Sequence, residues 1–256
     1  MGVTIHPITL GVDRCYLIRG EKIIMIDGGA PKQGKRFMKA IERLSIKPEE
    51  IKLIVLTHGH WDHIGSAKEI KDLTGAKLAL HRQEKDWLEK SLKPLPPGVT
   101  AWGNLFVKTM AIFMPLVHIP ATDVDIALGD GEFPLFEYGI PGRIVHTPGH
   151  SMGSVSVLLE TGEAFVGDSA MRMFPLRLTP GLPILAEDMR KLKESWKLLM
   201  EMGAKTIYPA HGKPFSVDFI REALLWRDAN SRERPPNAPF AADIPKKNDG
   251  FDGDLW

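Results

Sequence analysis

The chain has 256 residues and a formal net charge of +1, with 33 Lys and Arg residues against 32 Asp and Glu residues. Hydrophobic residues make up 43% of it and charged residues 25%, a balance typical of soluble globular proteins. A nearly neutral chain has no overall field to attract a nucleic acid or an anionic membrane, so we expect neither as a partner. The single cysteine, Cys15, excludes an internal disulfide, and the chain does not open on a signal-peptide pattern; both features favour a cytoplasmic protein.

Short apolar runs bounded by turns predict strands in the first half of the chain, and apolar residues at helical spacing predict helices. We expect strands at residues 3–11, 15–19, 22–26, 51–56 and 77–80. We expect helices at residues 31–44, 64–73 and 81–92. After a proline-rich break, an apolar helix is expected at residues 100–114, inside a segment (93–119) that could be a lid over the site, part of the core or the interface of a homodimer.

Strand signals return in the second half of the chain, again followed by helical spacing. We expect strands at residues 124–128, 132–138, 143–147, 155–160, 164–167 and 206–208, a loop at 171–184, and helices at 187–202 and 217–227. Strands followed by helices in both halves predict two stacked sheets with helices outside them. We therefore expect one domain over residues 1–229, followed by a polar C-terminal tail at 230–256.

The most informative stretch follows the apolar strand at residues 51–56 and reads Thr57-His58-Gly59-His60-Trp61-Asp62-His63. Three imidazoles and a carboxylate within six positions are costly to bury unless they bind something. Four further side chains also follow the ends of predicted strands: Asp27, His150, Asp168 and His211. Strand ends at one edge of packed sheets converge in space and often form ligand sites, so the pattern predicts a metal site.

Two sets of three side chains are expected to hold one ion each: His58, His60 and His150 for the first, and Asp62, His63 and His211 for the second. Asp168 could bridge the two ions, and Asp27 is expected to orient a ligand from behind. Nitrogen and carboxylate ligands without a thiolate suit Zn, Mn or Fe. We expect two divalent ions, with zinc as the first choice.

These residues also carry a family resemblance. The stretch at 57–63 resembles the HxHxDH signature of the metallo-β-lactamase superfamily, and Thr147-Pro148-Gly149-His150-Ser151-Met152-Gly153-Ser154 resembles its TPGHTxGS loop. Gly167-Asp168, His211-Gly212 and Ile26-Asp27-Gly28-Gly29 are similar to its GD, HG and IDxG motifs, in the family's order. The resemblance implies a four-layer αββα sandwich of two mixed β-sheets flanked by helices, with a dinuclear metal site at one sheet edge. The nearest branches are glyoxalase II and the acyl-homoserine lactonases.

The expected function is that of a metal-dependent hydrolase of a small molecule. A hydroxide that bridges the metals would attack the carbonyl of an ester, a thioester or a lactone, and Asp62 would orient it and handle its proton. Substrate contacts are harder to assign. Arg172 and Arg177 could recognise an acidic group, while Tyr208 and Lys213 flank the last histidine as candidate oxyanion contacts.

Three alternatives stay open from the sequence. One is a mononuclear iron oxygenase of the persulfide dioxygenase type, which resembles the same superfamily and uses a subset of these ligands. The others are a phosphodiesterase or nuclease of the superfamily and a non-catalytic scaffold that keeps the fold. A flavodiiron-type oxygen reductase is disfavoured because that branch places a glutamate where this chain has His60.

Overall fold

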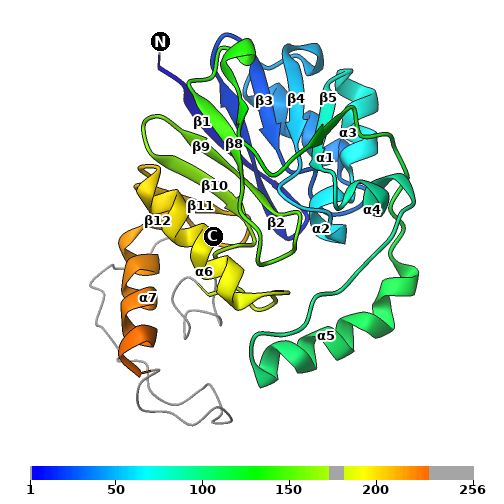
Figure 1. The fold of residues 1–256 in the computed structure, drawn as a ribbon. Coiled ribbons are helices and arrows are strands. Elements are labelled where there is room, and N and C mark those ends of the chain that lie inside the picture. The colour runs from blue at the N-terminus through cyan, green and yellow to red at the C-terminus, as the bar shows by residue number, and fades with distance from the viewer. Residues whose placement is uncertain (1, 173–181, 231–256) are drawn as a thin grey trace.

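A computed structural model describes residues 2–172 and 182–230, so residues 231–256 of the predicted tail lie outside the described part. Two six-stranded sheets are stacked face to face, and helices cover their outer faces (Figure 1). The predicted four-layer αββα sandwich is confirmed. The inner layers meet in an apolar core, because the facing strands bury side chains on both of their sides.

The first sheet is formed by the N-terminal half of the chain. Its strands, in spatial order, are β1 (Thr4–Leu10), β2 (Asp13–Arg19), β3 (Ile23–Ile26), β4 (Ile51–Val55), β5 (Lys77–His81) and β6 (Ile126–Leu128). β2 is antiparallel to both β1 and β3, whereas β3 to β6 run parallel to one another. The start of β2 therefore lies at the same edge as the ends of β3, β4 and β5.

The second sheet is formed by the C-terminal half. Its strands, in spatial order, are β12 (Phe215–Ser216), β11 (Thr206–Pro209), β10 (Glu163–Gly167), β9 (Val155–Leu159), β8 (Gly142–His146) and β7 (Phe133–Pro134). β10 and β11 are parallel, and β9 is antiparallel to both of its neighbours, β8 and β10. The ends of β8, β10 and β11 consequently lie at one edge.

The helices of the described residues are α1 (Gly34–Arg43), α2 (Trp61–Ile64), α3 (Ala67–Thr74), α4 (Lys85–Glu89), α5 (Ala101–Phe113), α6 (Met189–Glu201) and α7 (Asp218–Asn230). Of these, α1, α3 and α6 pack on the outer faces of the sheets through apolar residues. Single 3₁₀ turns cover Pro48–Glu50, Met114–Leu116 and Phe136–Tyr138. Phe37 of α1 and Ile70 of α3 join the core outside the first sheet, and Leu192 and Trp196 of α6 join the core outside the second.

Several predicted boundaries are wrong. The strand expected at 132–138 is only β7 followed by a 3₁₀ turn, because Pro134 has no amide hydrogen to continue the ladder. The helix expected at 64–73 is divided into α2 and α3. Of the helix expected at 81–92, only α4 is helical, and β12 was not predicted because it has two residues.

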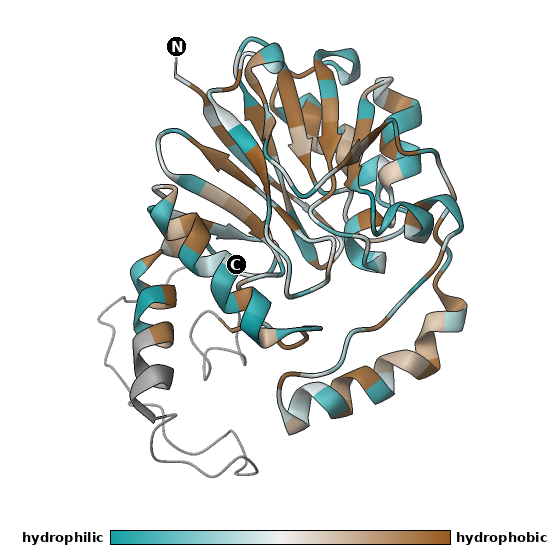
Figure 2. Cartoon of the chain, viewed as in Figure 1, coloured by the Kyte–Doolittle hydropathy of each residue, from teal (hydrophilic) through white to brown (hydrophobic). Residues whose placement is uncertain are grey.

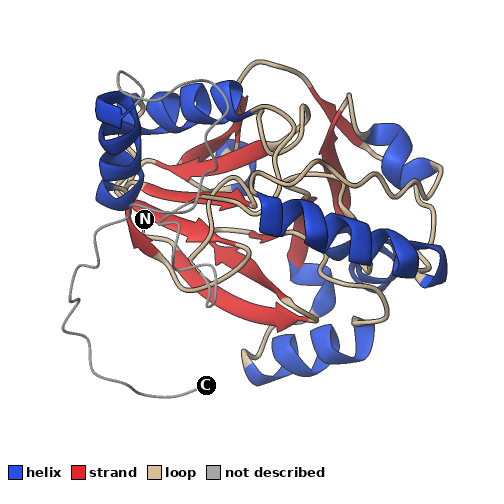
Figure 3. Cartoon of the chain, turned by 90° about the horizontal axis from the view of Figure 1, so that it is seen from below, coloured by secondary structure: helices blue, strands red, loops and turns tan. Residues whose placement is uncertain are grey.

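Helix α5 is displaced from the body of the protein. It lies below α2 in Figure 1 and nearest the viewer in Figure 3, beyond the sheet edge that carries α2. Hydrophobic residues recur along α5 (Figure 2). Of these, Trp102, Leu105 and Ile112 are 53%, 57% and 72% exposed. The core alternative for this helix is therefore wrong, and the lid and the homodimer interface remain predictions. Within the described residues, every helix is too short or too polar to cross a bilayer.

The two sheets approach each other closely at the edge that carries α2. The amide of Val155 donates a hydrogen bond to the carbonyl oxygen of Thr57 (2.8 Å), which links the start of β9 to the end of β4. Gly167 at the end of β10 has φ +53°, and a Cβ atom there would lie 2.3 Å from Thr57 Oγ1. A side chain at position 167 would both strain the backbone and push the sheets apart.

We predict that Gly167→Ala lowers the free energy of unfolding by more than the backbone conformation alone explains. Gly75 is a matched control, because its φ is +67° and a Cβ atom added there would have no neighbour within 4 Å. Gly75→Ala should cost about 1–2 kcal/mol for the left-handed backbone. Gly167→Ala should cost about 1–3 kcal/mol beyond that, because of overpacking. Urea denaturation measures both losses, and equal losses would contradict the close approach.

Candidate metal centre

The predicted ligands converge at the edge where the two sheets meet. The turn at residues 57–63 follows β4 of the first sheet. His150 lies in the loop between β8 and β9, Asp168 follows β10, and His211 follows β11, all in the second sheet. Both sheets therefore contribute to one cluster of buried polar side chains, of which His58, His63 and His150 are at most 1% exposed.

The first set of nitrogens belongs to three histidines. His150 Nε2 lies 3.2 Å from His58 Nε2 and 2.9 Å from His60 Nδ1. Burial and the neighbouring imidazoles lower the pKa of His58 well below its ordinary value, and burial and His150 lower the pKa of His60 to about 3. Neutral rings present lone pairs to one another, so the three nitrogens fit a cation between them.

The opposite nitrogens of these rings are held by other groups. Thr57 Oγ1 lies 3.1 Å from His58 Nδ1, and His150 Nδ1 donates to the carbonyl oxygen of Leu185 (2.8 Å). With Nδ1 occupied in this way, Nε2 of each ring is left to face the cluster. His60 is turned the other way, with Nδ1 inward, and its ring stacks on Trp87 (5.8 Å between centroids, 14° between planes).

The second set surrounds Asp168. Its Oδ1 lies 3.3 Å from both His63 Nε2 and His211 Nε2, and its Oδ2 lies 3.9 Å from His150 Nε2. Asp62 Oδ2 is 3.6 Å from His211 Nε2. Asp168 thus lies between the two sets, and a bridging role for it stays a prediction. Within the described residues, His63 Nε2 and Asp168 Oδ1 are buried without a hydrogen-bond partner. Buried polar atoms need a partner, and a divalent ion would provide one for both.

Asp27 holds the second set from behind. Its Oδ2 lies 3.0 Å from His63 Nδ1, and its Oδ1 accepts the amide hydrogen of Thr57 (2.8 Å). Burial alone would lower the pKa of His63, but the carboxylates of Asp27 and Asp168 raise it well above its ordinary value. The carboxylates therefore provide a strongly negative environment, and this environment stabilises a proton or a metal cation bound there.

Two buried carboxylates of this region were missed by the sequence analysis. Glu84 accepts the amide hydrogens of Gly59 (2.5 Å) and Gly153 (2.8 Å), so it joins the two ligand-bearing turns. Burial raises its pKa to about 7 against the effect of these hydrogen bonds. Asp13 lies beside Asp62, His63 and His211. Glu84 lies in the helix expected at residues 81–92, and Asp13 lies between the strands expected at 3–11 and 15–19, so neither sequence context marks a residue of the site.

The candidate substrate contacts are less well placed. The ring of Tyr208 is partly buried and packs against Tyr16 and Phe165 between the sheets. The Arg172 guanidinium stacks on the ring of Phe219 in α7, 4.3 Å from its centroid. Lys213 is exposed two residues after His211, and Arg177 lies outside the described residues.

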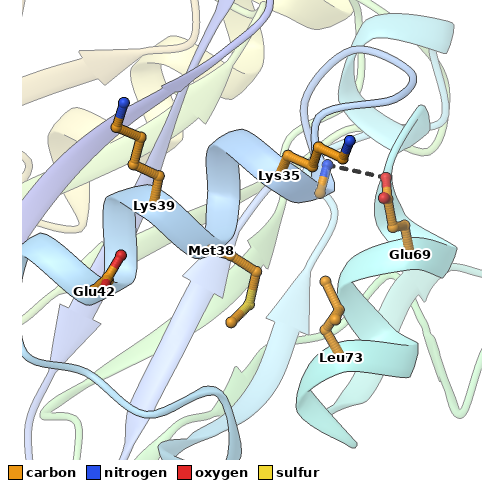
Figure 4. A pocket seen from close by; sticks show the side chains of 7 residues that line it. Lys35, Met38, Lys39, Glu42, Glu69 and Leu73 are labelled. Carbon is orange, nitrogen blue, oxygen red and sulfur yellow. Dashed lines mark hydrogen bonds between the residues drawn. The ribbon is translucent and has the colours of Figure 1, made fainter.

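Two other features of the surface are weaker candidates. Further along the edge, the rings of His81 and His146 are parallel (6°) and 4.3 Å apart beside Asp130. Lone pairs lie in the ring plane, so two stacked rings do not converge on one ion. A hollow between α1 and α3 is lined by Met38, Leu73 and charged side chains, and the amide of Gly34 donates to Glu69 across it (Figure 4). None of the residues lining this hollow belongs to the metal cluster.

Comparison with known proteins agrees with this geometry. Residues 8–211 match the model of the metallo-beta-lactamase superfamily. The chain belongs to this superfamily. It is 30% identical over 213 residues to the metallo-beta-lactamase fold-containing protein ST1585 of Sulfurisphaera tokodaii, covering 82% of this chain and 76% of that protein. The solved structure of ST1585 superposes with a TM-score of 0.65 and covers 96% of this chain and 92% of that chain, at 25% identity.

A second relative has a named activity. The chain is 28% identical over 171 residues to the hydroxyacylglutathione hydrolase GloC of Haemophilus influenzae, covering 66% of this chain and 71% of that protein. Members of the superfamily bind divalent metals, and most are metal-dependent hydrolases. In this chain, the clusters of imidazoles and carboxylates at the sheet edge could hold such ions.

We predict that Glu84→Ala destabilises the protein strongly, because it leaves the amides of Gly59 and Gly153 buried without an acceptor. The expected loss is about 1–3 kcal/mol for each amide. Glu187→Ala is the matched control, since the exposed Glu187 accepts one amide hydrogen, that of Met152, in the same loop. Its loss should be much smaller, because water can replace the acceptor. Equal losses in urea denaturation would show that Glu84 does not join the two turns.

Proposed function

We propose that the protein is a hydrolase that holds two divalent ions and cleaves an ester, a thioester or a lactone of a small molecule. The observation that carries the proposal is the pair of ligand sets on either side of Asp168. The first set offers three nitrogens, and the second offers nitrogens and carboxylate oxygens. Neither set contains a thiolate, and ligands of these types bind zinc, manganese or iron. We retain zinc as the expected metal.

The side chains have separate tasks in this mechanism. Two ions in such a site lower the pKa of water toward neutrality and polarise the substrate carbonyl. His58, His60 and His150 bind as neutral rings, which burial favours. Asp62 is the candidate acid and base, because its carboxylate lies at the cluster, with Oδ2 3.6 Å from His211 Nε2, where it could take a proton from the attacking water. That proton would then go to the leaving oxygen or sulfur.

The proposed substrate class is supported by the similarity to GloC, the relative named a hydroxyacylglutathione hydrolase. The glyoxalase II and lactonase branches remain the nearest ones in this proposal. Helix α5 is proposed as an apolar wall over the site. Its N-terminal end is tied to the segment that holds His150: the amide of Val99 donates to the carbonyl of Ile184 (2.8 Å), and His150 Nδ1 donates to that of Leu185. Arg172 and Lys213 are retained as contacts for an acidic group, and a homodimer through α5 is the alternative use of its apolar surface.

We predict two metal ions per chain and hydrolysis of carbonyl substrates. Protein purified without added metal should contain zinc by elemental analysis, and chelation should abolish turnover. The substrate panel would contain S-lactoylglutathione, homoserine lactones, p-nitrophenyl esters and a phosphodiester. Turnover of only the phosphodiester would overturn the substrate class. Iron as the sole metal, together with oxygen consumption on a persulfide, would favour the oxygenase alternative.

We predict that Asp62→Asn lowers kcat at least about a hundredfold, the range expected for loss of a general acid or base. Asp72→Asn is the matched control, because Asp72 is an exposed aspartate on α3 that pairs with Lys68. It should leave both kcat and the melting temperature unchanged. The proposed role of Asp62 is wrong if its asparagine variant keeps its full metal content and full hydrolysis.

A further inference from the structure

Asp13 is a fully buried carboxylate that the expected ligand sets do not use. Its exposed fraction is 0%, and within the described residues neither carboxylate oxygen has a hydrogen-bond partner. A buried carboxylate without a hydrogen bond or a cation is strongly unfavourable. The position of Asp13 therefore needs an explanation from the groups around it.

The neighbours of Asp13 are the side chains of the second ligand set. Its Oδ1 lies 3.3 Å from His211 Nε2. One ligand atom from each of Asp13, Asp62, His63 and His211 lies within 4.8 Å of the others. Asp13 is therefore part of the same small group of donor atoms and not a neighbour at a distance.

The backbone fixes Asp13 in this place. The amide of Arg14 donates to the carbonyl oxygen of Ala210 (2.9 Å), and the hydroxyl of Tyr16 donates to that of Pro209 (2.6 Å). These two bonds join the start of β2 to the segment that leads into His211. These bonds hold the start of β2, and with it Asp13, in a fixed position beside His211.

A simpler role would be to orient His211, as Asp27 orients His63. The contacts distinguish the two cases. Asp27 lies at Nδ1 of His63, the nitrogen opposite the one that faces Asp168. Asp13 lies at Nε2 of His211, the same nitrogen that faces Asp62 and Asp168, while Nδ1 of His211 has no partner among the described residues. Orienting carboxylates bind the outer nitrogen of a ligating ring, so Asp13 occupies the position of a ligand.

We propose that Asp13 is an additional ligand of the second ion and makes that site rich in oxygen. This inference rests on the metal assignment of the proposed function. The second site would then offer carboxylates from Asp13, Asp62 and Asp168 with two imidazoles, whereas the first offers three imidazoles. Zinc prefers four ligands, and carboxylate oxygens in larger number suit Mn²⁺ or Fe²⁺. The second site should therefore favour Mn²⁺ or Fe²⁺ over Zn²⁺ more strongly than the first does.

The test is metal binding by the metal-free full-length protein. Titration with Mn²⁺, followed by electron paramagnetic resonance of the free ion, should show two ions per wild-type chain. Asp13→Asn removes the charge and keeps the shape, and it should weaken one of the two sites about tenfold or more. Competition with Zn²⁺ should also shift toward zinc in this variant. Asp72→Asn should bind as the wild type does, and Asp62→Asn should weaken the same site as Asp13→Asn.

A second measurement does not depend on the folding of a variant. Wild-type crystals grown with Mn²⁺ should show an anomalous peak in contact with a carboxylate oxygen of Asp13. Two bound ions with Asp13 outside their coordination shells, or unchanged affinities in Asp13→Asn, would overturn this inference and leave the proposed function standing. A wild-type protein that binds no ion would overturn both.

Discussion

The carboxylate of Asp27 is the group on which the site depends most. It accepts hydrogen bonds from the amide and the hydroxyl of Thr57, and it holds His63 at Nδ1. Thr57 in turn contacts His58 through its hydroxyl and receives the amide of Val155 at its carbonyl oxygen. One carboxylate at the end of β3 thereby sets the ligand turn and, through Thr57, the approach of the second sheet. Asp27 itself has φ +62°, a strained conformation for a residue with a side chain, which the surrounding contacts hold in place.

The sequence predicted the fold and the convergence of the seven expected ligands because both depend on strong local signals. Apolar runs marked the strands, and the ends of parallel strands share an edge. Boundaries were predicted less well where the elements are short, as with β7 and β12. Their formation depends on pairing with distant strands, which no local pattern reveals.

Asp13 and Glu84 were missed for two different reasons. Asp13 stands at the beginning of β2, whereas the predicted ligands follow the ends of strands. Because β2 runs antiparallel to β3, its beginning lies at the site edge. The residues of β2 carry no signal of its direction relative to β3. Glu84 is one of many charged residues in a polar segment, and only the folded chain shows that it is 1% exposed and that two ligand turns share it.

Each ligand set draws on both halves of the chain, and this has a consequence for folding. His58 and His150 are 92 residues apart in sequence, yet their Nε2 atoms are 3.2 Å apart. An ion held by both would act as a cross-link that closes a long loop, much as a disulfide does in a secreted protein. Because the unfolded chain offers no such preformed site, the free energy of metal binding adds to the free energy of folding. A chain with a single cysteine cannot form an internal disulfide. In this chain, the metal ions would be the cross-links between the two sheets.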